Sequence, residues 1–130
     1  MRDTCALVAY LTGEAGSDHV EAVLNDHECH LHSLMVYEFF KDTLRRTSSF
    51  DDADELLRDL DALGVARTDT MDDAVLKEAA HVRLSRNPMA LPDAFGVAVA
   101  TLMGWIFLTS DRGELQPLKD AGKPIEFFRP

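Results

Sequence analysis

Two aspartates, Asp93 and Asp111, enclose a run of residues, 94–110, that carries no charged side chain, although the chain as a whole has a net charge of −10. Carboxylate oxygens are the ligands that Mg²⁺ and Mn²⁺ prefer, so two aspartates brought to one place can hold a metal ion. A metal ion held in this way can activate a water molecule for hydrolysis. This chemistry requires the uncharged run to fold back on itself, so that its two ends meet.

The uncharged run has the signals of a helix followed by a strand. Pro92 suits the first turn of a helix, and Asp93 beside it suits the positive end of the helix dipole. Gly104 is a natural helix end, and the residues after it, 105–109 (WIFLT), are typical of a strand. About eleven helical residues rise ~16 Å, and about five strand residues return ~16 Å. The spacing therefore predicts that Asp93 and Asp111 lie at the same edge of a sheet.

Two more acids fit the same edge. Asp3 precedes a predicted short helix at Cys5–Leu11, at the point where a first strand should end. Glu38 lies in an apolar segment, 36–40, of a helix that Ser33 can cap. A carboxylate in such a segment is costly to bury unless it is paired or binds a metal ion. Taken singly, each acid also suits an ordinary role as helix cap, turn residue or partly exposed helix acid.

The rest of the chain alternates strands with helices. At 130 residues it is long enough for a core of its own, and we expect a single domain over 1–130. The alternation predicts an α/β domain with a mostly parallel sheet, whose active site lies at the carboxyl ends of the strands. Besides the elements above, we expect strands at 28–33, 65–68 and 124–128, and helices at 19–25, 33–46, 48–64 and 71–87.

Composition narrows the class of protein. With 46% hydrophobic and 28% charged residues, the sequence is that of a globular chain rather than a disordered one. The negative charge repels nucleic acid at long range, so such a substrate must be held by local basic residues or by metal ions. The uncharged run is shorter than the ~20 residues of a membrane span, and we expect a cytoplasmic protein without a membrane anchor. Cys5 and Cys29 suit buried thiols, while a disulfide between them stays open.

Four potential metal ligands, His27, Cys29, His30 and His32, lie in or beside one predicted strand. Because side chains alternate across a strand, His30 and His32 share one face, while His27 and Cys29 share the other. The sequence contains no second ligand group with zinc-finger spacing. We therefore interpret these four as strand and edge residues.

The four acids, in their order and local context, resemble those of the PIN-domain nucleases, above all the VapC-like ribonuclease toxins of toxin–antitoxin pairs. The segments that carry the resemblance are DTCALVAYLTGE (3–14), SLMVYE (33–38), LPDAFGVAVA (91–100) and FLTSD (107–111). The resemblance implies a three-layer α/β/α sandwich with a mostly parallel central sheet of four to five strands. It also implies an acidic quartet made of Asp3, Glu38, Asp93 and Asp111, with Thr109 supporting the last acid.

The resemblance further implies an activity and its partners. Four converging carboxylates repel one another without a cation, and hard oxygen ligands suit Mg²⁺ or Mn²⁺. By resemblance, the chain is a metal-dependent endoribonuclease toxin that hydrolyses RNA, is neutralised by a cognate antitoxin and forms a homodimer. The apolar residues that suit either protein interface are Tyr37, Phe39, Phe40 and Leu44. Two interpretations stay open for the basic residues near these acids: contacts with RNA phosphates, or solvated helix ends and ordinary ion pairs. These residues are Lys41, Arg45, Arg46 and Arg112.

Two other functions fit the same residues. The family's first strand usually supplies several apolar residues before its aspartate, whereas only Met1 and Arg2 precede Asp3 here. Either that strand is very short or the start of the chain is truncated, and this departure favours a PIN-like binding module without catalysis. A PIN nuclease of RNA processing would share the toxin's chemistry. Metal-dependent cleavage that is lost in an Asp93→Asn variant would separate a nuclease from a binding module.

Overall fold

In a computed structural model of the chain, five parallel strands form one sheet in the order β3-β2-β1-β4-β5. The structure describes residues 4–8, 27–62, 64–85, 89–109 and 112–127. The strands are β1 (Thr4–Val8), β2 (His27–His32), β3 (Ala66–Thr68), β4 (Ile106–Thr109) and β5 (Ile125–Phe127). The helices are α2 (Ser33–Thr47), α3 (Phe50–Ala62), α4 (Asp73–Ser85), α5 (Leu91–Met103) and α6 (Arg112–Asp120).

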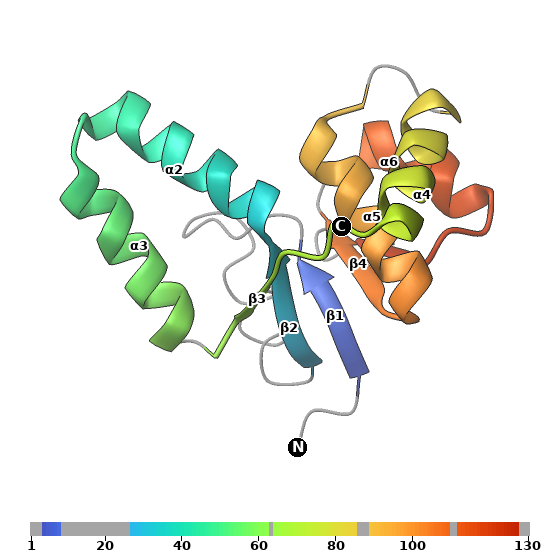
Figure 1. Ribbon diagram of the computed structural model, residues 1–130, viewed down its shortest axis with the longest axis horizontal. Helices are drawn as coiled ribbons and strands as arrows, with labels where there is room; N and C mark the ends of the chain where they lie inside the picture. The colour runs from blue at the N-terminus through green and yellow to red at the C-terminus, as the bar shows by residue number, and fades with distance from the viewer. Residues whose placement is uncertain (1–3, 9–26, 63, 86–88, 110–111, 128–130) are drawn as a thin grey trace.

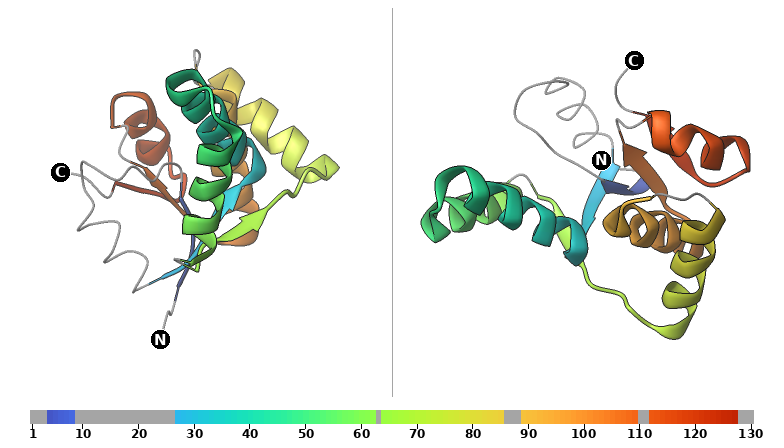
Figure 2. Two further views of the ribbon diagram at one scale, coloured as in Figure 1. Left: turned by 90° about the vertical axis from the view of Figure 1, so that its left-hand side faces the viewer. Right: turned by 90° about the horizontal axis from the view of Figure 1, so that it is seen from above.

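Helices cover both faces of this sheet. The view from above in Figure 2 shows α4 and α5 on one face and α6 on the other. Figure 1 shows α2 leaving the end of β2 and forming a hairpin with α3 that extends to the side of the sheet. The architecture is therefore the three-layer α/β/α sandwich that the family resemblance implied. None of the described helices combines the length and the apolar character that crossing a bilayer would require.

The strand order places a switch in direction between β1 and β4. From β1 the chain proceeds outward to β2 and then β3, and it later adds β4 and β5 on the opposite side of β1. In open parallel sheets, ligands bind at the carboxyl ends of the strands where the order reverses in this way. The carboxyl ends that meet at this point are Val8 of β1 and Thr109 of β4. The topology thus singles out the edge at which the sequence placed its carboxylates.

The start of the chain differs from the expectation. The predicted helix at Cys5–Leu11 is wrong for residues 5–8, because Thr4–Val8 forms the central strand. Thr4 pairs with His27, the first residue of β2, and so lies at the amino edge of the sheet. A short apolar run is compatible with either a buried strand or a buried helix. Here residues 4–8 pair with β2 on one side and β4 on the other, and this pairing makes the run a strand.

The predicted return of the uncharged run is confirmed. α5 ends at Gly104, whose φ of 71° is the left-handed conformation that terminates many helices. β4 follows at once and runs back along α5, which packs against it (Figure 1). Gly96 allows the close approach, because a Cβ atom at this position would overlap the ring of Phe107 on β4. The amino end of α5 and the carboxyl end of β4 therefore lie at the same edge of the sheet.

The start of α2 also differs from the expectation. The N-cap is His32 rather than Ser33, and His32 Nδ1 accepts a hydrogen bond from the Leu34 amide at 3.1 Å. Ser33 is instead the first helical residue. α3 begins more conventionally, since Ser49 Oγ accepts from the Asp52 amide at 3.2 Å. The cap of α2 thus comes from the last residue of β2.

The other described elements follow the prediction to within two residues, with one addition. The predicted strands at 28–33, 65–68 and 124–128 and helices at 33–46, 48–64 and 71–87 are present, while the helix expected at 19–25 lies outside the described residues. α6 was not predicted, and Pro117 within it lowers its intrinsic helix propensity. Its buried side chains Leu115 and Leu118 show that packing on the sheet decides its conformation.

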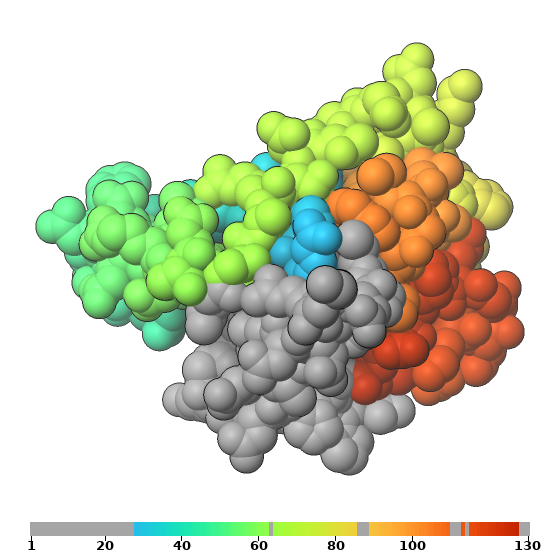
Figure 3. Space-filling model, turned by 90° about the horizontal axis from the view of Figure 1, so that it is seen from below, coloured from blue at the N-terminus to red at the C-terminus, as the bar shows by residue number. Residues whose placement is uncertain are grey.

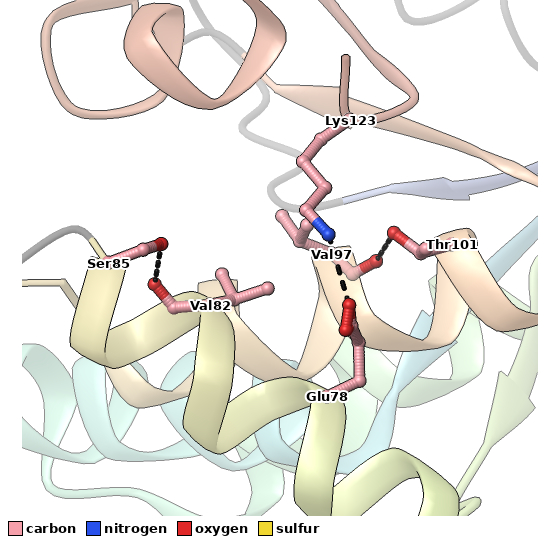
Figure 4. Close-up of polar contacts among 6 residues, drawn as sticks. All are labelled: Glu78, Val82, Ser85, Val97, Thr101 and Lys123. Carbon is pink, nitrogen blue, oxygen red and sulfur yellow. Dashed lines mark hydrogen bonds and ion pairs between the residues drawn. The ribbon is translucent and has the colours of Figure 1, made fainter. Parts of the chain in front are cut away.

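A polar contact ties α4 to the segment just before β5. Figure 4 shows Lys123, just before β5, reaching past α5 to Glu78 on α4, with Nζ and Oε1 3.0 Å apart. On α5 itself, Thr101 Oγ1 donates to the Val97 carbonyl oxygen at 2.8 Å. Both partners of the ion pair are mostly buried, which weakens its screening by solvent. This contact fixes α4 against the part of the molecule that follows β4.

Candidate functional site

Glu38 is the first of the predicted acids that the structure describes. It lies in the second turn of α2, and 29% of its side chain is exposed. The Lys41 ammonium lies 2.7 Å from Oε2 of Glu38, one turn further along the helix. This hydrogen bond raises the pKa of Lys41 above its ordinary value of 10.5. The half-buried carboxylate of Glu38 thus has a cation beside it.

Asp93 is the second described acid. It lies in the first turn of α5, where the helix dipole favours a negative charge, and it is partly buried. Because α5 runs back along β4, this first turn lies at the carboxyl edge of the sheet. α2 and α5 also pack against each other. Glu38 and Asp93 therefore stand on two adjacent helices near the same edge.

Thr109 marks the end of β4 at this edge. It is the last residue of the strand, it pairs with Phe127 of β5, and only 3% of its surface is exposed. Asp111 follows two residues later in the sequence and lies outside the described residues, as does Asp3. Thr4, the residue after Asp3, lies at the opposite edge of the sheet from Thr109. The described residues thus include two of the four predicted acids and the hydroxyl residue predicted to support the last one.

Three of the four basic residues predicted to contact RNA follow Glu38 along α2. Arg45 forms an ion pair with Asp42 at 3.1 Å and is mostly exposed, and Arg46 beside it is exposed as well. Arg45 lies seven residues beyond Glu38, which is about 10 Å along a helix axis. Arg112 begins α6, directly after the segment that contains Asp111. The cation closest to a predicted acid within the described part of the chain is that of Lys41.

The two candidate metal ligands that the structure describes, Glu38 and Asp93, suit a hard divalent cation. Both are carboxylates, and oxygen ligands favour Mg²⁺ or Mn²⁺ over zinc. Glu38 already has a positive group within hydrogen-bond distance, which a partly buried carboxylate requires. No group of three or more potential ligands comes together among the residues that the structure describes. A complete metal site therefore needs ligands from outside them, and Asp3 and Asp111 are the sequence's candidates.

The histidines of β2 take roles that the sequence did not indicate. His30 stacks on Trp105, with ring centroids 4.3 Å apart. His32 is 1% exposed and uses both ring nitrogens in hydrogen bonds. Cys29 is a buried free thiol, which agrees with the interpretation as a buried thiol rather than as half of a disulfide. The one signal for His32 was its position directly before a helix, where a side-chain acceptor can cap.

Comparisons with known proteins agree with this architecture. A family model of the PIN domain matches residues 1–119. A solved toxin–antitoxin complex from Klebsiella pneumoniae has a chain similar in fold, with a TM-score of 0.60 and 12% identity over 93% of this chain and 95% of that chain. VapBC2 from Rickettsia felis, solved bound to a DNA fragment from its promoter, has a chain with a TM-score of 0.69 and 9% identity over 95% of this chain and 98% of that chain. No curated protein matches the sequence. The family model covers nearly the whole length of the chain, which therefore belongs to the PIN domain family.

Proposed function

We propose that this PIN domain is a metal-dependent endoribonuclease and the toxin of a toxin–antitoxin pair. The observation that carries the proposal is the position of Glu38 and Asp93, on adjacent helices near the carboxyl edge of a parallel sheet. That edge lies at the switch between β1 and β4, where such sheets bind their ligands. The likeness in fold to chains of toxin–antitoxin complexes supports the biological role.

In the proposed mechanism, Asp3, Glu38, Asp93 and Asp111 hold Mg²⁺ or Mn²⁺, with Thr109 supporting Asp111. The bound ion supplies an activated water and stabilises negative charge on the phosphodiester. By fixing where the cation would lie, the carboxylates would set the position of the scissile phosphate and of the attacking water. The residues proposed to contact neighbouring phosphates, and so to offset the negative charge of the chain, are Lys41, Arg45, Arg46 and Arg112.

The direct test is cleavage of a fluorescent RNA with Mn²⁺ and with EDTA. Asp93→Asn should abolish cleavage in Mn²⁺, with a loss beyond the roughly 10–100-fold that follows removal of an outer-shell partner. Asp73→Asn is the matched control, because Asp73 is an exposed acid in the first turn of α4 and loses the same helix-dipole interaction. Equal cleavage by the wild type, Asp93→Asn and Asp73→Asn would mean that Asp93 takes no part in the reaction.

The antitoxin is proposed to dock between α2 and α3. A hollow of about 220 Å³ opens there, lined by Phe40, Leu44, Phe50, Ala53 and Asp54. Phe50 is 75% exposed, so this apolar surface is available to a partner. The outer face of α3 carries exposed acids at Asp51, Asp52, Asp54, Glu55, Asp59 and Asp61. The surface therefore suits an apolar segment that is flanked by basic residues.

A second copy of the chain is proposed to dock on α4 and α5. Leu76, Leu84 and Leu91 are exposed on these helices, beside a hollow of about 210 Å³ that Arg83 and Phe95 help to line. α3 and α4 lie on separate sides of the molecule (Figure 3), so the two proposed interfaces do not compete. Each interface can therefore be tested separately.

A pair of substitutions separates the two interfaces. Phe50→Asp should weaken co-purification with the cognate antitoxin by about tenfold or more, the scale of an interface anchor, and leave the oligomeric state unchanged. Leu84→Asp, at a residue 84% exposed, should convert a dimer to a monomer in light scattering and leave antitoxin binding intact. The reverse pattern would exchange the two assignments.

A non-catalytic binding module is the second candidate function. The observation that favours it is the start of β1 at Thr4, at the amino edge of the sheet, directly after Asp3. Such a module would bind RNA or protein without cleaving RNA and would not respond to Mn²⁺. A thermal melt of the wild type and Asp93→Asn with and without Mn²⁺ decides, because a ligand of the folded state raises its melting temperature.

A further inference from the structure

The hydrogen bonds of the His32 side chain define its protonation state. Nδ1 lies 3.1 Å from the Leu34 amide nitrogen, which can only donate. Nε2 lies 3.1 Å from the Thr70 carbonyl oxygen, which can only accept. Nδ1 must therefore be unprotonated while Nε2 carries the proton. His32 is thus held as the neutral Nε2–H tautomer.

The same side chain joins three separate parts of the fold. Through Leu34 it caps the amino end of α2, four residues before Glu38. Through Thr70 it holds the segment between β3 and α4. Its ring also packs on Phe95 of α5, with centroids 5.7 Å apart, two residues after Asp93. One buried side chain therefore contacts both helices that carry the described carboxylates.

A smaller cap would not make these connections. Serine, threonine, asparagine and aspartate are the usual N-caps, and each satisfies helix amides only. Imidazole adds a second polar atom at its far side and an apolar ring between the two. Because His32 is 1% exposed, both hydrogen bonds are shielded from water, and losing either leaves a buried polar group without a partner.

We propose that His32 is a positioning residue, which fixes Glu38 on α2 relative to Asp93 on α5 at the carboxyl edge of the sheet. Because Glu38 and Asp93 are metal ligands only under the proposed function, this inference rests on that function. It assigns His32 no contact with metal or RNA. A metal site tolerates little displacement of its ligands, and removing a residue that orients a ligand typically costs about 10–100-fold in metal affinity or activity.

Two substitutions divide the hydrogen bonds of His32 between them. In His32→Asn the amide oxygen lies near the position of Nδ1, so the variant keeps the cap of α2 and loses the bond to Thr70. In His32→Gln the amide nitrogen lies near the position of Nε2, so the variant keeps the bond to Thr70 and loses the cap. Both lose the ring contact with Phe95, which makes them a matched pair.

The test measures Mn²⁺ affinity by calorimetry and amide hydrogen exchange in α2. We expect His32→Gln to weaken Mn²⁺ binding about tenfold or more and to speed exchange in the first two turns of α2. We expect His32→Asn, which keeps the cap but loses the Thr70 bond and the Phe95 contact, to weaken Mn²⁺ binding by a similar factor while leaving exchange in the first two turns of α2 as in the wild type. Val82→Ala, a cavity in the core of α4, is the control for lost stability and should leave Mn²⁺ affinity unchanged.

Either of two results would overturn the inference. One is equal Mn²⁺ affinity in the wild type and both variants, with only the melting temperature lowered, since His32 would then be merely structural. The other is an ¹⁵N imidazole spectrum of His32 that shows a protonated Nδ1. If the wild type binds no Mn²⁺, the proposed function fails, and the exchange pattern in α2 then decides separately whether His32 holds the helix.

Discussion

The ammonium nitrogen of Lys41 lies 2.7 Å from Oε2 of Glu38, one turn further along α2. The same carboxylate is proposed to bind a divalent cation, so Lys41 and the metal ion would share one ligand. In the described structure, the Lys41 ammonium partly neutralises the carboxylate. If a metal ion replaces Lys41 at this carboxylate, as the proposed function requires, the ammonium would become available to an RNA phosphate.

Replacing Lys41 should therefore affect metal and RNA in opposite directions. In Lys41→Met we expect Mn²⁺ to bind about two- to fivefold more tightly, the scale of one exposed ion pair, and RNA to bind more weakly. Calorimetry with Mn²⁺ alone and a filter-binding assay with RNA measure the two effects. Arg45→Met is the control, because Arg45 forms the same type of ion pair with Asp42 and does not contact Glu38. Unchanged Mn²⁺ affinity in Lys41→Met would contradict the competition between Lys41 and the metal ion for Glu38.

The same pair gives a pH dependence whose sign follows from the raised pKa of Lys41. The hydrogen bond to Glu38 is the main cause, opposed by partial desolvation and assisted by the negative charge of Glu38. Because the folded-state pKa lies above the ordinary 10.5, the stabilisation is complete below 10.5 and is lost as the pH rises through the folded-state value. Urea unfolding from about pH 8 to about pH 12 should show the wild type converging on Lys41→Met only in the alkaline range. A constant difference up to the highest pH would contradict this assignment.

The position of β1 makes Asp3 the decisive member of the proposed quartet. Thr4 begins β1 at the amino edge, whereas Thr109, two residues before Asp111, ends β4 at the carboxyl edge. If all four acids bind the ion, Asp3→Asn and Asp111→Asn should each weaken Mn²⁺ binding at least tenfold. Calorimetry on the two variants measures this directly. A normal affinity in Asp3→Asn together with a loss in Asp111→Asn would reduce the site to three carboxylates.

Gly96 should be intolerant of even the smallest side chain. A methyl group there overlaps the Phe107 ring, which is fully buried in the core. We expect Gly96→Ala to lower the free energy of unfolding by about 1–3 kcal/mol through overpacking, although alanine is the better helix former. Urea denaturation measures the change. Phe107→Leu should relieve the overlap, so the double variant should be more stable than the sum of the single changes predicts; strict additivity would argue against the clash.

Local signals in the sequence were sufficient to predict α5, which carries Asp93, and β4, which leads to Asp111. Pro92 marks the start of α5, Gly104 its end, and the aromatic and β-branched residues of β4 follow directly. Each of these signals acts within a few residues of its element, so no knowledge of the rest of the fold is needed. The position of Glu38 in an apolar helix likewise follows from spacing alone.

Other features were decided by residues far apart in the sequence. The run at residues 5–8 has no period that separates a helix from a strand, and only pairing with β2 and β4 makes it the central strand. α6 contains a proline, and it is helical where Leu115 and Leu118 pack into the core. In both cases, contacts with residues far away in the sequence decide the local conformation.

The sequence by itself determined the order of the elements from β2 to β4, the family and the acids to be tested, because these depend on residue type and on spacing along the chain. Only the tertiary structure decided what stands beside each acid and which residue holds its helix. The alternation of side chains placed His32 in a strand, but its partner at Thr70 is 38 residues away and its ring partner is on α5. Contacts of this kind depend on how the layers pack, and packing distances do not appear in the spacing of residues along the chain.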